Sequence, residues 1–155
     1  MNLNEEPRGG TMSLTKAGLA IGSTATQVAI LNPAGTGVVF AIAGIQYYKA
    51  NAASTAITAA ATQPLLTKCI YLVCLDASGT LSTVKGKEIL ASDLLNGARV
   101  IDWPDVPAGK CAIGAFKISL ANAATFTAGT TALNATDVTA TYYDFLNVPT
   151  SGLTS

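Results

Sequence analysis

Histidine is absent from this 155-residue sequence, and charged residues make up only 12% of it. Histidine is the commonest general base and the commonest metal ligand in proteins, so the side chain on which most catalytic and metal sites depend is missing. We therefore expect a protein that is not an enzyme and that needs no cofactor. The formal net charge is zero, which gives no electrostatic reason to expect a nucleic-acid partner.

Cysteine is scarce as well, and the three present, Cys69, Cys74 and Cys111, form no Cys-x-x-Cys pair. A zinc site would need further ligands that the sequence does not supply. We expect three buried free thiols, which suits folding in a reducing cytoplasm. The first sixteen residues contain no apolar run of signal-peptide length, and this favours the same compartment.

Charge is missing altogether from Ala17 to Tyr48, a stretch long enough to raise the question of a membrane span. The turn-forming residues NPAGTG (32–37) divide this stretch into pieces too short to cross about 30 Å of hydrocarbon. We therefore expect strands here, and no membrane partner. Over the whole chain, low charge and positive mean hydropathy indicate a surface that is largely covered by copies of the protein or by a partner.

The bulky residues of the second piece alternate with period two over 38–42 and change parity after Gly44. A change of parity at a glycine is typical of a β-bulge or a sharp bend. We interpret residues 38–48 as one bent core strand. The same device recurs around Gly114, where the bulky residues again change parity.

Short strand-like runs separated by turn residues dominate the remainder of the chain, and they predict an all-β fold of about eight strands. The turn DASG (76–79) predicts a hairpin, residues 86–97 are the only plausible helix, and residues 51–63 are interpreted as an extended loop or edge segment. This pattern is typical of a β-sandwich, jelly-roll-like, with at most one short helix. We expect an N-terminal arm (1–16), which a neighbouring subunit would hold if it is ordered, and a single sandwich domain (17–155).

The single tryptophan, Trp103, lies in a proline-broken loop and has three possible roles: a cap on one end of the sandwich, an interface anchor or a carbohydrate platform. Tyr142 and Tyr143 are adjacent in a predicted strand, so one faces the core and the other is a candidate contact residue.

The carboxylates at Glu88, Asp93, Asp102 and Asp105 match no calcium-loop spacing. We interpret them as solvated loop charges and expect no metal site.

Five segments of the chain follow one another in a distinctive order. The segments, in order between residues 17 and 133, are GLAIG, FAIAGIQYYKA, KCIYLVCLDASGTLSTVKG, PAGKCAIGAFKI and FTAGTTAL. Their recurring features are a strand ending in a tyrosine and a lysine, an Asp-x-Ser-Gly-Thr hairpin, a Pro-x-Gly before an Ile-Gly strand, and a Phe-x-x-Gly-Thr-Thr turn. In this order the features resemble a family of small virion structural proteins of tailed bacteriophages, which implies synthesis in the host bacterial cytoplasm.

The resemblance implies a capsid decoration, cement or head-fibre protein that assembles as a symmetric homo-oligomer, a trimer or a dimer, on the outer surface of a virion. The major capsid protein would be its partner, and its location the capsid surface. Candidate interface residues lie in the arm, in the Trp103 loop and near the chain end. They are Met1, Leu3, Arg8, Leu14, Trp103, Pro104, Tyr142, Tyr143 and Phe145. The alternatives are a tail or fibre-base component and a carbohydrate-binding β-sandwich module.

Overall fold

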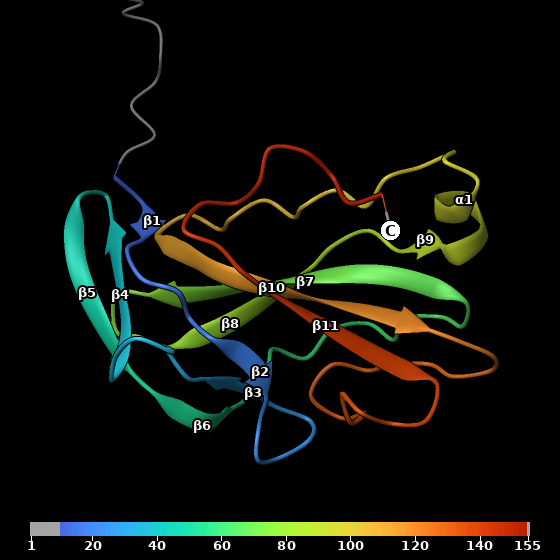
Figure 1. Cartoon of the computed structure of the whole chain (residues 1–155), viewed down its shortest axis with the longest axis horizontal. Coiled ribbons are helices and arrows are strands. Elements are labelled where there is room, and N and C mark those ends of the chain that lie inside the picture. The colour runs from blue at the N-terminus through green and yellow to red at the C-terminus, as the bar shows by residue number, and fades with distance from the viewer. Residues whose placement is uncertain (1–9, 155) are drawn as a thin grey trace, which may run out of the picture.

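The structure, a computed structural model, describes residues 10–154 and is built almost wholly from β-strands (Figure 1). In chain order its elements are β1 (Met12–Ser13), β2 (Leu19–Ile21), β3 (Val28–Ile30), β4 (Gly37–Ile42), β5 (Ile45–Ala50), β6 (Ala52–Thr55), β7 (Thr67–Asp76), β8 (Leu81–Lys85), β9 (Ile89–Leu90), α1 (Ala91–Leu95), β10 (Lys110–Leu120) and β11 (Val138–Asp144). The expected all-β, sandwich-like fold with one short helix is confirmed. The described part of the chain has more strands than the expected eight, because β4 and β5 replace the one strand expected over 38–48 and because β1, β6 and β9 lie where no strand was expected.

The strands of the described residues form three antiparallel sheets, one central and two smaller. The central sheet has the order β11-β10-β7-β8, and β9 pairs with the start of β7. The predicted hairpin is present as β7 and β8. Two smaller sheets, β1-β4-β5 and β2-β3-β6, lie on one side of the central sheet (Figure 1).

The main core lies between the central sheet and the two smaller sheets, and aromatic rings fill its middle. Tyr71 of β7 stacks on Phe116 of β10, with ring centroids 5.0 Å apart, and it meets the edge of Phe126 at 5.7 Å. Such pairs add about 0.5–1.5 kcal/mol beyond the burial of their area. Tyr71 and Phe116 are partners in the β7–β10 pairing, so their stacking joins the two central strands, and Phe126 packs on them from the segment that follows β10.

The central sheet is also covered on its other face, which explains why β7 is apolar at both parities. Ile70, Leu72 and Cys74 point to this second side, where two irregular segments, 98–109 and 145–154, lie over them together with α1 (Figure 1). We call these two segments the cover. The main core is enclosed mostly by strands, with Ile57, Phe126 and Leu133 contributed by connecting segments, whereas this second cluster is enclosed largely by loops.

The outer edge of β8 is closed by the segment that was expected to be extended. Thr58 and Thr83 exchange two hydrogen bonds, each from the backbone N–H of one residue to the side-chain Oγ1 of the other, at 3.0 and 2.9 Å. Lys85 Nζ donates to the Ala61 carbonyl at 2.7 Å and forms an ion pair with Glu88. These bonds satisfy an edge that would otherwise be open to pairing with another chain.

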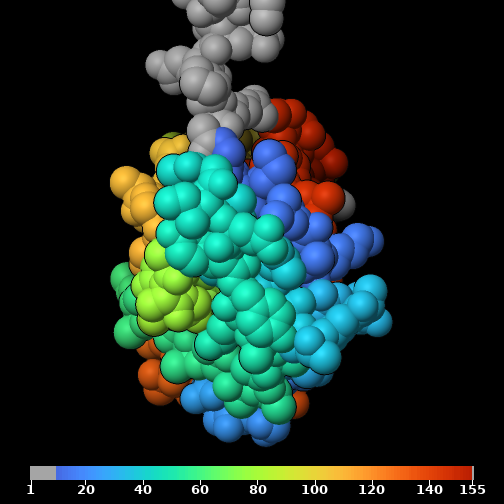
Figure 2. All heavy atoms as spheres, turned by 90° about the vertical axis from the view of Figure 1, so that its left-hand side faces the viewer, coloured from blue at the N-terminus to red at the C-terminus, as the bar shows by residue number. Residues whose placement is uncertain are grey.

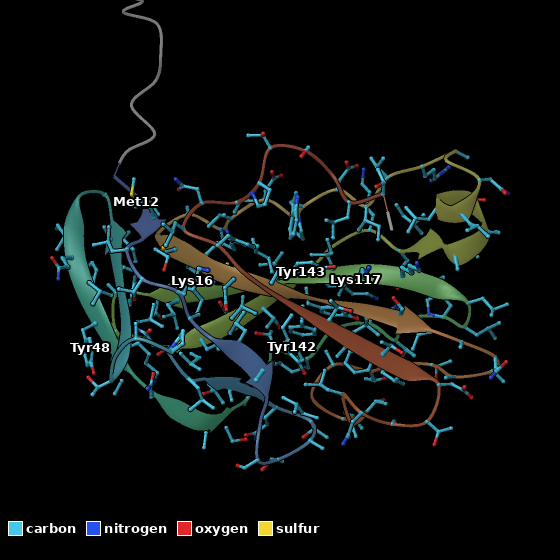
Figure 3. The ribbon with its side chains drawn as sticks, in the orientation of Figure 1. Met12, Lys16, Tyr48, Lys117, Tyr142 and Tyr143 are labelled. Carbon is cyan, nitrogen blue, oxygen red and sulfur yellow. The ribbon has the colours of Figure 1, made fainter. Side chains whose placement is uncertain are left out.

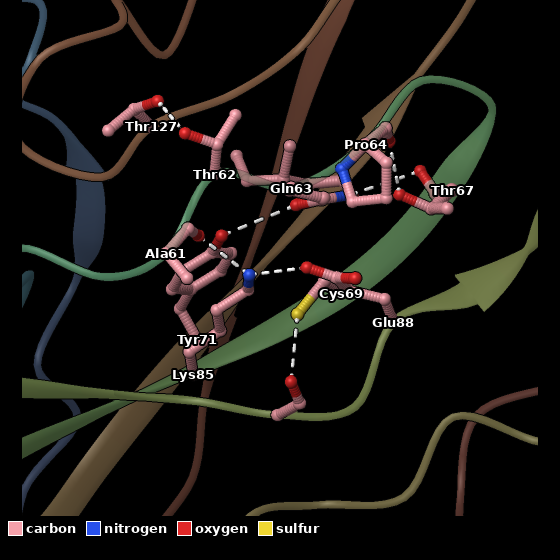
Figure 4. A network of polar contacts seen from close by, with 12 residues as sticks. Ala61, Thr62, Gln63, Pro64, Thr67, Cys69, Tyr71, Lys85, Glu88 and Thr127 are labelled. Atoms are coloured by element: carbon pink, nitrogen blue, oxygen red, sulfur yellow. Dashed lines mark hydrogen bonds and ion pairs between the residues drawn. The ribbon is translucent and has the colours of Figure 1, made fainter.

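A buried glutamine holds the end of this segment in place (Figure 4). Gln63 is fully buried, and its side-chain amide donates to the carbonyl oxygens of Thr67 (3.1 Å) and Ile118 (3.2 Å). The Tyr71 hydroxyl donates to the Gln63 side-chain oxygen at 3.4 Å. Because each polar atom of this side chain has a partner, we interpret the network as a structural element.

The expectation of one bent strand over residues 38–48 is wrong, because the chain reverses there. Ala43 (φ 51°) and Gly44 (φ 82°) form a two-residue turn between the paired residues Ile42 and Ile45, so β4 and β5 are a hairpin. Figure 2 views the molecule from the side on which β5 lies, and it shows β5 across the middle of that face, beside the turn between β7 and β8. The parity change at Gly44 was therefore a chain reversal.

At Gly114 the same sequence signal was interpreted correctly. The register between β10 and β7 shifts between Ala112 and Gly114, as a β-bulge requires. The two glycines look alike in sequence and differ in what precedes them: Ala43 also adopts a positive φ, whereas no residue adjacent to Gly114 does.

Part of the expected N-terminal arm lies within the described residues. There β1 pairs with β4, and Ser13 N–H donates to the Leu146 carbonyl at 2.9 Å. Residues 12 and 13 are therefore held by the protein's own body. No helix of the described chain is long and apolar enough to cross a membrane.

Candidate binding site around Trp103

The loop that carries Trp103 is fixed to the chain end by a short antiparallel bridge. Ile101 and Leu153 exchange two backbone hydrogen bonds of 2.8 and 2.9 Å, and the Ile101 side chain is fully buried on the central sheet. Gly152 allows this close approach, since a Cβ there would lie 2.9 Å from the Ile101 carbonyl oxygen. The two parts of the cover therefore form one layer, although some fifty residues separate them in sequence.

Trp103 is the centre of this layer. Its indole Nε1–H donates to the Ser151 carbonyl at 2.8 Å. Its ring meets Tyr143 edge-to-face with centroids 6.0 Å apart, and Phe145 in the same way at 5.6 Å. A partly exposed tryptophan with its N–H bonded and two aromatic neighbours has little freedom to turn.

Pro104, the next residue, packs against the end of β8. A Cβ at Gly86 would lie 3.1 Å from Pro104 Cγ, so glycine at this position lets the loop lie directly on the strand end. Four of the predicted interface residues are thus brought together by the fold. They are Trp103, Pro104, Tyr143 and Phe145.

The two adjacent tyrosines point to opposite faces, as predicted, but neither is free (Figure 3). Tyr142 packs into the main core beside Phe116, and its hydroxyl is the only buried side-chain polar atom of the described chain without a hydrogen-bond partner. Tyr143, the expected contact residue, lies under Trp103 instead. Burial raises the pKa of both hydroxyls. Tyr143 stays partly exposed, and its role as an interface residue remains a prediction.

The other predicted interface residues lie elsewhere. Leu14 is half exposed beside β4, where its N–H donates to the Val39 carbonyl, far along the chain from Trp103. Met1, Leu3 and Arg8 fall outside the described residues.

Two hollows lie on the two sides of the Trp103 loop. One, of about 460 Å³, is bounded by residues 84–87, and the other, of about 340 Å³, by residues 148–152. Residues 102–105 line both. Asp102 and Asp105 are exposed, as expected for solvated loop charges, and the described residues contain no group of three potential metal ligands.

A second surface, formed by four exposed leucines near α1, could not be predicted from the sequence. Leu66 accepts the Ala91 N–H through its carbonyl, and Leu90 is opposite Thr67 in the β7–β9 pairing, so residues distant in sequence share one end of the molecule. We call this surface the leucine end. Its members are Leu65, Leu66, Leu90 and Leu95. Nothing in the hydrophobic pattern separates these leucines from core residues, because only the fold decides which neighbour covers them.

Comparison with protein-family models, with curated proteins and with solved structures finds no match for this chain.

Proposed function

We propose that the protein is a non-enzymatic structural protein of a phage virion, which binds the outer surface of the capsid and stabilises the shell as a symmetric homo-oligomer. Its capsid partner is inferred from the sequence resemblance to virion proteins. The observation that carries the binding role is the leucine end, an apolar surface on a protein whose central sheet is already covered on both faces.

The exposure of these leucines supports a contact surface. Leu65 and Leu66 are each 47% exposed, Leu90 is 50% exposed and Leu95 is 89% exposed. Single exposed leucines are ordinary, but several at one end form the kind of patch that marks a protein interface.

Backbone strain at Leu66, within the leucine end, also supports a contact surface there. Leu66 has φ 57°, in the left-handed region that costs a residue with a side chain about 1–2 kcal/mol. Strained positions of this kind concentrate at functional sites. The strain places two consecutive leucines at the surface, where an interface would cover them.

Hundreds of copies on a shell need only modest affinity each, because avidity adds the contacts of an oligomer. A β-sandwich with both faces of its central sheet covered is suited to this role, since its binding surfaces lie at its ends and do not compete with its core. The contacts within the oligomer and the contact with the capsid would both lie at the ends of the sandwich and in the N-terminal region.

The test is co-sedimentation of the purified full-length protein with capsids of the virus that encodes it, prepared without the protein. We expect saturable binding and a higher melting temperature of the decorated shell. Leu90→Ser combined with Leu95→Ser should weaken binding about tenfold or more, as expected for a lost interface core. Leu31→Ser is the matched control, because Leu31 is similarly exposed (48%) and lies after β3.

Absence from the capsid surface, or presence only in the tail by electron microscopy, would overturn the proposal in favour of a tail or fibre-base component. Mass measurement of the free protein decides the oligomeric part: a dimer or a trimer supports it, and a monomer at every concentration contradicts it.

A further inference from the structure

The larger hollow beside the Trp103 loop has the size and composition of a ligand site. Its volume of about 460 Å³ falls within the range of small-molecule pockets. It is lined by an indole and a proline on one side and by the end of β8 with its following residues on the other. The lining residues are Val84, Lys85, Gly86, Lys87, Asp102, Trp103, Pro104 and Asp105.

The wall of this hollow is rigid before any ligand arrives. Trp103 is fixed by its bond to the Ser151 carbonyl and by two aromatic neighbours, and its loop is anchored through Ile101. A preorganised aromatic ring loses little entropy when a ligand packs against it. The Trp103 ring is therefore a preformed flat surface for a ligand, and we call it the platform.

Three charged groups around the platform have no partner within residues 10–154. Asp102 and Asp105 are carboxylates that only accept hydrogen bonds, and Lys87 is an ammonium that only donates them. Lys85, by contrast, is already engaged with Glu88 and the Ala61 carbonyl. The free groups therefore offer mostly acceptors beside an apolar ring.

We propose that this hollow binds a neutral saccharide. A pyranose has an apolar face of C–H groups, which fits an indole, and a rim of hydroxyls, which donate to carboxylates and accept from an ammonium. The three free groups sum to one negative charge, which disfavours an anionic ligand. The two carboxylates are too few for a divalent cation, which takes six or more oxygens when it is Ca²⁺. The inference stands apart from capsid binding and adds a glycan-binding activity to the same molecule.

The sole tryptophan makes the test direct, because all indole fluorescence comes from the proposed platform. The probes are five neutral oligosaccharides: maltotriose, cellotriose, mannotriose, galactobiose and the trimer of N-acetylglucosamine. Each is titrated to about 10 mM, because a dissociation constant of this size corresponds to a weak binding free energy of about −2.7 kcal/mol. We expect at least one to change the emission saturably and to show saturation transfer in NMR.

Variants separate the proposed contact from an indirect effect. Asp102→Asn combined with Asp105→Asn keeps the shape of the loop and should weaken binding about tenfold, as expected when hydrogen bonds to charged acceptors become neutral ones. Asp93→Asn, which changes a carboxylate of α1 outside this hollow, is the matched control and should leave binding unchanged. The proposal is overturned if no probe binds by either method, or if the double variant binds as well as the parent. Neither measurement uses capsids. A failure of the saccharide proposal can therefore be distinguished from a failure of the proposed capsid binding.

Discussion

At the scale of single residues, Gly114 shows how closely the layers approach one another. A Cβ at this position would lie 2.5 Å from Leu19 Cδ1 and 2.5 Å from the Tyr143 carbonyl oxygen. The leucine side chain can turn aside, but the carbonyl belongs to β11 in the same sheet. Glycine is therefore required here by packing, and not by its backbone freedom.

Gly114→Ala should lower the free energy of unfolding by about 2 kcal/mol, the cost typical of overpacking a core. Urea denaturation followed by circular dichroism measures it. Gly35→Ala is the control, because the nearest atom to a Cβ there is the Asn32 side-chain nitrogen, at 3.3 Å, and the substitution should cost less than about 0.5 kcal/mol. Equal losses for the two variants would show that contact with β11 is not the cause.

The reactivity of each cysteine also depends on its own surroundings. Burial raises the pKa of the Cys69 and Cys74 thiols to about 12 and that of Cys111 to about 11, and all three are free and buried, as the sequence predicted. Since the thiolate is the reactive form, the native protein should not react with Ellman's reagent at pH 8 within minutes, whereas the protein unfolded in guanidinium should release three equivalents. Rapid reaction of one thiol in the native state would mean that its strand is exposed.

At the scale of elements, the sequence predicted strands well and their connections less well. The hairpin at 76–79 was predicted because Asp, Ser and Gly together favour a turn. The hairpin at Ala43 and Gly44 was missed because alanine rarely adopts positive φ, so nothing in the sequence marked a reversal. A turn can be predicted from sequence only where its residues are those that this type of turn prefers.

This mismatch predicts a stabilising substitution. Ala43→Asn should raise the free energy of unfolding by about 0.5–1 kcal/mol, because asparagine tolerates the left-handed region and Asn-Gly is the preferred two-residue turn. Thermal unfolding checks it, with Ala77→Asn as the control: Ala77 is also exposed in a hairpin turn, but its φ is not positive. A melting temperature that does not rise for Ala43→Asn alone would contradict the proposed strain.

The hairpin at 76–79 carries a pH-dependent contribution. Asp76 Oδ1 accepts hydrogen bonds from Ser78 Oγ (2.6 Å), Thr80 N (2.9 Å) and Ser78 N (2.9 Å), and these bonds, that of the Ser78 hydroxyl first, lower the pKa of the carboxyl. A lowered pKa in the folded state means that the stabilisation is present above the unfolded value near 4 and is lost as the pH falls through the folded value. Asp76→Ala should therefore destabilise the protein at pH 7, and the difference from the parent should shrink on acidification below pH 4. A difference that stays constant from pH 7 to pH 2 would exclude the carboxylate as its source.

At the scale of the whole molecule, the sequence predicted a sandwich but not the arrangement of its second layer. Trp103, Pro104, Tyr143 and Phe145 were each singled out as contact residues, yet their contacts with one another could not be foreseen. Trp103 and Tyr143 lie forty residues apart and belong to a loop and a strand, so no periodicity connects them. The tyrosine that the alternation of a strand turns away from the main core packs against Trp103 of the cover.

This arrangement predicts two levels of stability within one molecule. The central strands β7 and β10 are joined by a long ladder and buried on both faces. The two segments of the cover are joined to each other by the Ile101–Leu153 bridge and the Trp103–Ser151 hydrogen bond, and they are held on the sandwich by the Ser13–Leu146 backbone hydrogen bond and side-chain packing. Segments with few backbone bonds open at a lower free energy than the global transition. In native-state hydrogen exchange, the amides of Ile101 and Leu153 should therefore exchange at least about a hundredfold faster than those of Tyr71 and Phe116, a difference of about 2.7 kcal/mol. Leu153→Ala should speed exchange at Ile101 and leave Tyr71 unchanged. Equal protection of all four amides would mean that the cover unfolds only with the sandwich, and the Trp103 hollow would then be as rigid as the core itself.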